Sequence, residues 1–99
     1  MSEFKHLSVM PNEIIEALQI QEGLIYVDGT LGGAGHSKLI LEKLNGTGHL
    51  YSFDQDINVI KKHRDEANIH SNWTLVHKNF AEMKAFFEEK NIKVTGGIV

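Results

Sequence analysis

Residues 24–35 read LIYVDGTLGGAG, and this stretch decides the fold. It begins with four apolar residues and Asp28, a pattern typical of a buried strand that ends in an acid. Four of the nine glycines follow within residues 29–35, and glycine lets a backbone turn tightly and approach a ligand closely. Apolar residues at Ile40, Leu41 and Leu44 then share one helical face, and Asn45-Gly46 ends that segment. The stretch therefore predicts a strand, a tight loop and a helix over residues 36–44.

The same alternation continues along the chain. Asp56 is placed to cap a second helix, whose inner face we expect to carry Ile57, Ile60 and Ala67. A helix is also predicted upstream, beginning near Pro11 and ending at Gly23. The remaining predicted elements are strands over residues 49–54, 73–77 and 94–99, and a helix from Met83 to about Asn91.

Strands that alternate with helices of about ten residues predict an α/β fold with a parallel sheet of about four strands. Ligands of such sheets bind outside the carboxyl ends of the strands. The segments expected at that edge are residues 28–36, 54–56 and 77–80.

Length and composition narrow the class of protein. The 99 residues allow one domain at most, and a formal charge of −3 is unusual for a free-standing nucleic-acid-binding module. The absence of cysteine excludes a disulfide framework and a thiolate metal site, and fits a cytoplasmic location. No run of about 20 apolar residues indicates a membrane span, and no apolar stretch near Met1 indicates a signal peptide.

The histidines show no metal-ligand spacing, so we predict no metal site. We expect His49, His63, His70 and His77 to be exposed or to lie at strand ends. The basic run over residues 61–64 is interpreted as a solvated helix face.

The glycine loop differs from a dinucleotide-binding fingerprint. Counted from Gly33, the pattern G-x-G-x-x-G needs a glycine at position 38, where Lys38 stands. Asp28 precedes glycines that are closely spaced, which suits a ligand without a pyrophosphate, such as S-adenosylmethionine. A plain tight turn remains the alternative.

Three residues outside the glycines are candidate ligand contacts. Asp54 ends the second strand, where a carboxylate accepts hydrogen bonds from both hydroxyls of an adenosine ribose; its alternative role as a helix cap suits Asp56 better. Phe80 follows the third strand and either flanks an adenine or belongs to the core. His36 begins a helix, where its N–H or its ring could face a bound carboxylate.

Taken together, these residues resemble the bacterial 16S ribosomal RNA cytosine-N4 methyltransferases of the RsmH/MraW type. The resemblance rests mainly on residues 26–37, YVDGTLGGAGHS. Three shorter matches agree in order and spacing: HLSVM at residues 6–10, FDQD at residues 53–56, and Asn79-Phe80. The similarity covers essentially the whole chain, but only about the first third of a typical family member.

The resemblance implies a Rossmann-like class I methyltransferase core that uses S-adenosylmethionine and acts on ribosomal RNA of the small subunit. It implies cofactor contacts at Ala34, Gly35, His36, Asp54 and Phe80. The loop would hold the amino-acid end of the cofactor, Asp54 the ribose, and Phe80 the adenine side. No catalytic residue is identified.

Two departures from the family pattern stand out. Ala34 occupies a position where the family often has glycine, a change that we expect to be mild. Residues 95–98 read TGGI and lack the acid that the family usually has there. We expect residues 1–99 to form the N-terminal, cofactor-binding portion of one methyltransferase domain, without the later strands, the inserted helical domain or the RNA contacts.

Two alternatives remain open from the sequence. The chain could be a fragment of another α/β nucleotide-binding domain of the NAD type. It could also be a truncated, non-enzymatic product, whose exposed fourth strand would favour a dimer.

Overall fold

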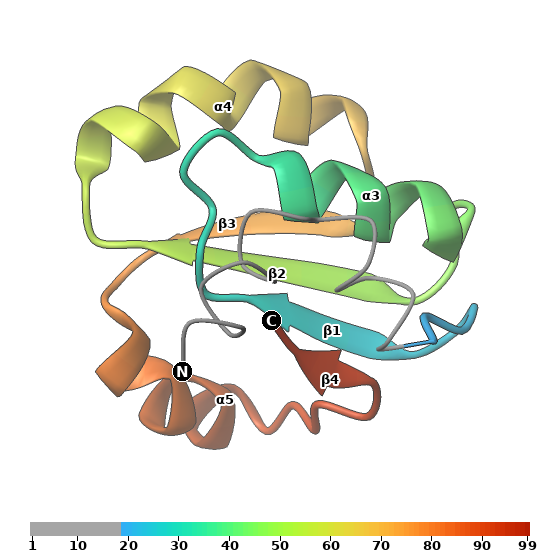
Figure 1. Ribbon diagram of the computed structural model, residues 1–99. Coiled ribbons are helices and arrows are strands. Elements are labelled where there is room, and N and C mark those ends of the chain that lie inside the picture. The colour runs from blue at the N-terminus through green and yellow to red at the C-terminus, as the bar shows by residue number, and fades with distance from the viewer. Residues whose placement is uncertain (1–18) are drawn as a thin grey trace, which may run out of the picture.

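The computed structural model describes residues 19–99 and shows a four-stranded parallel sheet with helices on both faces (Figure 1). The part of the upstream helix predicted over residues 11–18 lies outside the described residues. In chain order the elements are β1 (Ile25–Asp28), α3 (Gly35–Leu44), β2 (His49–Asp54), α4 (Ile57–Ile69), β3 (Trp73–His77), the 3-10 turn η1 (Phe80–Glu82), α5 (Met83–Lys90) and β4 (Gly97–Ile98). The predicted α/β alternation is confirmed.

The strand order is β3-β2-β1-β4, and all pairings are parallel. Tyr26 pairs with Leu50 on one side and with Gly97 on the other. After β3 at one edge, the chain crosses to place β4 at the opposite edge. Reversal of the strand order beside β1 creates the crevice where α/β sheets bind their ligands.

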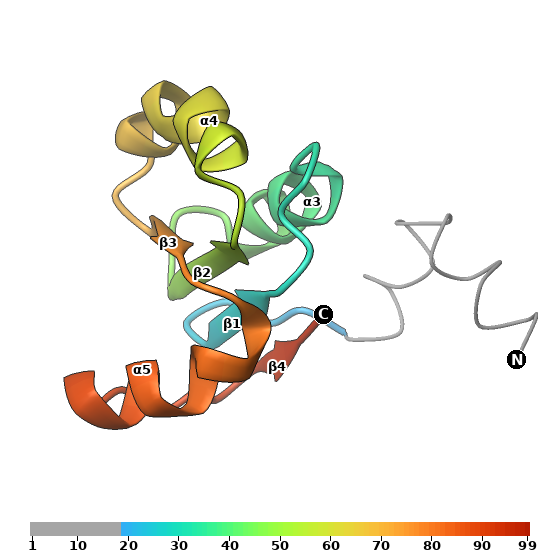
Figure 2. The same cartoon turned by 90° about the vertical axis from the view of Figure 1, so that its left-hand side faces the viewer.

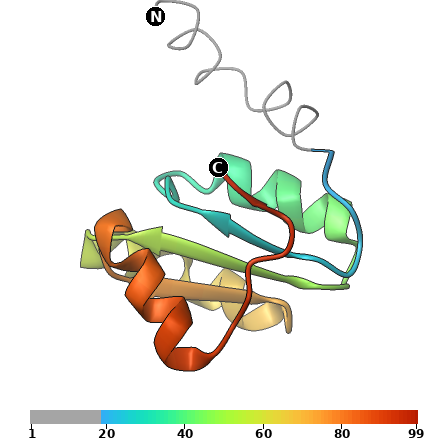
Figure 3. The ribbon, with the colours of Figure 1, turned by 90° about the horizontal axis from the view of Figure 1, so that it is seen from below.

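The side chains of the strands alternate between two apolar layers, because successive strand residues point to opposite faces. Tyr26, Leu50 and Trp73 face α3 and α4, whereas Val27, Phe53 and Val76 face α5. Viewed along the sheet, α3 and α4 lie on one side and α5 on the other (Figure 2). Figure 3 shows α5 from below, on its own face of the sheet.

The helix ends follow the local chemistry of the sequence. Asp56 caps α4 as predicted, because its carboxylate accepts a hydrogen bond of 2.9 Å from the backbone N–H of Asn58. Asn45 and Asn91 end α3 and α5 in the left-handed conformation that asparagine tolerates. A reciprocal capping box between Asn79 and Glu82 starts the turn before α5, which the sequence analysis did not foresee.

Two predictions of the fold are corrected. The fourth strand was expected over residues 94–99 but comprises only Gly97–Ile98, although Val99 still donates a backbone hydrogen bond to Val27. Ile57 was expected on the inner face of α4, but its side chain is 36% exposed. The buried positions of that helix are Ile60, His63 and Ala67, whereas Ile57 is its first residue.

Within residues 19–99, no helix is long and apolar enough to cross a membrane.

Candidate functional site

The three segments predicted to meet at the carboxyl edge of the sheet lie together there. Figure 2 looks onto this edge, where the chain leaves β1, β2 and β3. A pocket of about 200 Å³ opens between these connections and contains two of the predicted contact residues, Asp54 and Phe80. Its lining consists of Gly29, Phe53, Asp54, Gln55, Lys78, Asn79 and Phe80.

Asp54 is half-buried and fixed by backbone donors on both sides. Its Oδ1 accepts a hydrogen bond of 2.8 Å from the N–H of Asp56. Its Oδ2 accepts one of 3.3 Å from the N–H of Gly32. Each carboxylate oxygen has two lone pairs, so both oxygens retain room for a further donor. The contact with Gly32 joins the end of β2 to the glycine loop.

Phe80 lies at the rim of the pocket and not in the core. Its side chain is 47% exposed, so the interpretation as a core phenylalanine is wrong. The ring packs directly over Gly29, and a Cβ atom at position 29 would overlap it. The absence of a side chain at Gly29 allows this close approach, and the ring presents a flat apolar surface to the pocket.

Ala34, Gly35 and His36 join the glycine loop to α3. Ala34 is fully buried, and its N–H donates to the carbonyl of Leu31 while its own carbonyl accepts from Lys38. Its side chain therefore belongs to the core, and its backbone shapes the loop. Gly35 and His36 form the first turn of α3, where helix N–H groups have no intrahelical partner.

The alanine at position 34 is a larger change than expected. Its φ angle is +69°, in the left-handed region that glycine adopts freely. A residue with a Cβ atom costs about 1–2 kcal/mol there. The expectation of a mild change is therefore wrong for the backbone, although the methyl group itself packs in the core.

Asp28 does not face the pocket but is fully buried below the loop. Its Oδ1 accepts hydrogen bonds of 2.7 Å from the N–H and the hydroxyl of Thr30. Its Oδ2 accepts one of 2.7 Å from Ser37, whose oxygen lies 2.6 Å from that of Ser52. Only Ser52 gave a signal in the sequence, because it stands between Tyr51 and Phe53 in a strand.

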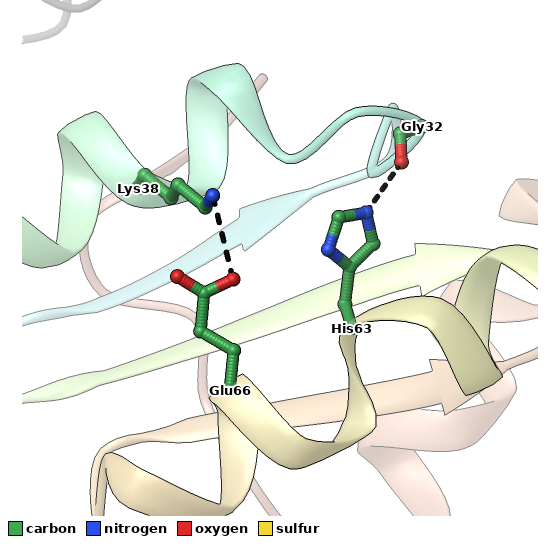
Figure 4. A network of polar contacts seen from close by, with 4 residues as sticks. All are labelled: Gly32, Lys38, His63 and Glu66. Atoms are coloured by element: carbon green, nitrogen blue, oxygen red, sulfur yellow. Dashed lines mark hydrogen bonds and ion pairs between the residues drawn. The ribbon is translucent and has the colours of Figure 1, made fainter.

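His63 supports the glycine loop, and the sequence analysis did not predict this contact. It was expected to be exposed, but it is 5% exposed and lies between Ile60 and Ala67 on the inner face of α4. Its Nε2 donates a hydrogen bond of 2.9 Å to the carbonyl of Gly32 (Figure 4). The spacing of three and four residues to Ile60 and Ala67 was the signal that could have identified it.

A second link joins α4 to α3. Lys38 Nζ lies 3.4 Å from Glu66 Oε1, one helical turn beyond His63 (Figure 4). Both side chains are about half exposed, so this ion pair contributes little to stability. It nevertheless shows that the residue at the third fingerprint position lies on the outside of the helix, away from the loop.

The rest of the basic run behaves as expected, because Lys61, Lys62 and Arg64 are exposed. A larger hollow of about 480 Å³ lies between α4 and β3 and contains none of the predicted contact residues. Within residues 19–99, no three His, Asp or Glu side chains gather in a way that could hold a metal ion.

Comparison with known proteins assigns this chain to a family. The sequence profile of the MraW methylase family matches residues 3–99. Ribosomal RNA small subunit methyltransferase H from Clostridium botulinum strain Okra is 44% identical over 97 residues. The match covers 98% of this chain and 31% of that relative, and the protein from strain Hall gives the same values. The chain therefore spans about a third of the length of these curated relatives.

Solved structures support the fold. A methyltransferase homologue from Pyrococcus horikoshii has a TM-score of 0.64 at 22% identity, over 79% of this chain and 25% of that one. A putative rRNA-methylase from Clostridium thermocellum has a TM-score of 0.61 at 23% identity, over 81% and 44% of the two chains. At this level of identity the similarity concerns the fold alone.

Proposed function

Because the chain belongs to the MraW methylase family, we propose that the protein transfers a methyl group from S-adenosylmethionine to a cytosine N4 amine of 16S ribosomal RNA. Residues 1–99 would be the N-terminal, cofactor-binding portion of its methyltransferase domain. The names of the 44% identical relatives support the ribosomal substrate. The partner would be 16S ribosomal RNA or the small ribosomal subunit, and the protein would act in the cytoplasm.

The observation that carries the proposal is that Asp54 and Phe80 line the same pocket at the sheet edge. A carboxylate with free lone pairs suits the two hydroxyls of a ribose. The exposed ring of Phe80 suits the flat face of an adenine. These two side chains come from successive strand ends, so one adenosine could contact both.

The glycine loop suits the opposite end of the same ligand. Gly35 and His36 offer first-turn N–H groups of α3, and the helix dipole favours a carboxylate there. Gly32 is held from two sides, by Asp54 at its N–H and by His63 at its carbonyl. These two contacts restrain Gly32 before a ligand arrives, which reduces the entropy lost on binding.

The chemistry needs little from the protein beyond position. S-adenosylmethionine supplies a methyl group that its sulfonium already activates. The residues of this chain would bind and orient the cofactor, and the rate would come from alignment with the amine and exclusion of water. A cytosine within folded RNA must be splayed out to reach such a site. We assign no catalytic residue.

Replacement of Asp54 by alanine tests the proposal. We expect the full-length Asp54→Ala variant to bind S-adenosylmethionine at least tenfold more weakly, because two charge-assisted hydrogen bonds are lost. Isothermal titration calorimetry gives the affinities. Asp65→Asn, on the exposed face of α4, is the matched control and should bind as the wild type does. Unchanged affinity in Asp54→Ala would refute the ribose assignment.

A parallel titration with NADH addresses the alternative of a nicotinamide-binding domain. We expect no binding of NADH to the wild type. Tight binding of NADH in the absence of S-adenosylmethionine binding would overturn the proposed function.

A further inference from the structure

The buried carboxylate of Asp28 receives hydrogen bonds along two chains of side chains. One chain runs from Trp73 Nε1 to Ser52 at 2.8 Å, on to Ser37, and then to Asp28 Oδ2. The other runs from His36 Nδ1 to the Thr30 hydroxyl at 3.0 Å and then to Asp28 Oδ1. An ionised carboxylate only accepts hydrogen bonds, so both chains donate toward Asp28.

This direction fixes the position of the hydrogen on His36. The Thr30 hydroxyl has a single proton, which it donates to Asp28 Oδ1 over 2.7 Å. Toward His36 the same oxygen acts as the acceptor, so Nδ1 of the imidazole must carry the hydrogen. A neutral imidazole protonated at Nδ1 has a bare lone pair at Nε2.

That second nitrogen has no hydrogen-bond partner. His36 Nε2 is shielded from solvent, and residues 19–99 supply no partner for it. A buried acceptor without a donor is unfavourable, because it has lost its hydrogen bonds to water. This unsatisfied lone pair lies beside the glycine loop, which indicates that a ligand supplies the missing hydrogen-bond donor.

The charges around the loop indicate which donor fits. A bare Nε2 lone pair repels a carboxylate and accepts from an ammonium group. Asp28 is fully buried, and the one ion pair found within the described residues, Lys38–Glu66, does not involve it. A cation near His36 would therefore also be attracted by the charge of Asp28, transmitted through Thr30.

We propose that Asp28 and Thr30 are positioning residues that hold His36 in the Nδ1–H tautomer, so that its Nε2 accepts a hydrogen bond from the ammonium group of the cofactor's amino-acid end. This inference rests on the proposed function and deepens it. It reverses the expectation that the ring of His36 faces a carboxylate, and leaves the carboxylate to the N–H groups of the first turn of α3. Because Nε2 is shielded, the groups that cover it must move slightly for the ligand to reach it.

The tautomer is measurable without a ligand. In full-length protein labelled with ¹⁵N-histidine, long-range ¹H–¹⁵N correlation at about pH 8, where ordinary imidazoles are neutral, should show a protonated Nδ1 and a bare Nε2. Thr30→Ser retains the hydroxyl and should give the same spectrum. Thr30→Val removes it at similar volume and should shift the ring toward the Nε2–H tautomer. An Nε2–H tautomer in the wild type, or equal spectra for the two variants, would overturn the inference.

The hydrogen bond between His36 Nε2 and the ammonium group is tested with three ligands: S-adenosylhomocysteine, its deaminated analogue and its decarboxylated analogue. By calorimetry, His36→Phe should weaken binding of the two amine-bearing ligands about tenfold, which corresponds to the loss of one hydrogen bond to a charged group. Binding of the deaminated analogue should be unchanged. Equal losses for all three ligands would refute the ammonium contact.

The two experiments separate the hypotheses. Failure of the wild type to bind any of the three ligands would contradict both the proposed function and the ammonium contact. The tautomer, measured without ligand, would still confirm or refute the positioning role of Asp28 and Thr30. A thermal melt of each variant establishes that it is folded.

Discussion

At the scale of single residues, the pocket depends on the missing side chain of Gly29. The ring of Phe80 lies where a Cβ atom at this position would be. Phe80 is at the start of a turn and half exposed, so it can move aside without unfolding the protein. A methyl group at position 29 would therefore displace the Phe80 ring in the pocket and leave the packing of the core largely unchanged.

We expect Gly29→Ala to lower the affinity for S-adenosylmethionine about tenfold while changing the free energy of unfolding by less than about 1 kcal/mol, because surface substitutions outside the core have small effects. Asp65→Asn, on the exposed face of α4, is the control, since it lies outside the pocket. Calorimetry and urea denaturation measure the two quantities. Equal affinities for the two variants would show that the Phe80 ring does not contact the ligand.

At the scale of elements, β2 carries two titratable rings that burial affects in opposite directions. His49 and Tyr51 lie with ring centroids 4.6 Å apart, and His49 Nε2 lies 2.7 Å from the Thr74 hydroxyl. Burial lowers the pKa of His49 below 6.5, because desolvation disfavours its charged form. Burial raises the pKa of Tyr51 above 10.0 for the same reason.

The lowered pKa of His49 gives a pH dependence with a definite sign. Below about pH 6.5 the unfolded chain binds the proton more readily than the folded one, so stability falls as the pH is lowered. We expect His49→Gln, which retains a hydrogen-bonding group near Thr74, to lose less stability than the wild type between about pH 7.5 and 5.5. Urea denaturation at both values measures the difference, and identical pH dependences would contradict it.

The elements also show which features the sequence could predict. The strands and helices of the sheet follow from apolar periodicity, and Asp56 was recognised as a cap because capping depends on one residue and its neighbours. His63 was not recognised, because its contact with Gly32 joins residues that are 31 positions apart. The hydrogen-bond network of Asp28 was not predicted for the same reason, since Ser52 and Trp73 come from other strands.

The candidate site also combines features that the sequence predicts with features that it does not. That Asp54 and Phe80 would lie at one edge follows from the rule for parallel strands. The left-handed conformation of Ala34 was indicated only by the glycine that the family often has there, because an alanine by itself indicates an ordinary backbone. Which nitrogen of the His36 ring carries the hydrogen depends on hydrogen bonds with Thr30 and Asp28. Only the folded chain brings these side chains together.

At the scale of the whole molecule, the described sheet has its shortest strand beside the expected ligand crevice. Its order places β1 and β4 beside the point where the strand order reverses, and β4 is only two residues long. The chain spans 31% of the length of its curated relatives. A formal charge of −3 also gives this portion little attraction for the phosphates of RNA.

We therefore expect a polypeptide limited to these 99 residues to give no methyl transfer to 16S ribosomal RNA, whereas the full-length protein does. Binding of S-adenosylmethionine to the short chain should persist but be weaker, because Asp54 and Phe80 are present but the chain spans only 31% of the length of its relatives. Transfer of a radiolabelled methyl group measures the activity, and circular dichroism establishes that the short chain is folded. Turnover by the folded short chain would show that the groups that hold cytosine lie within these 99 residues, and would move the search for them to the edge formed by the ends of β1, β2 and β3.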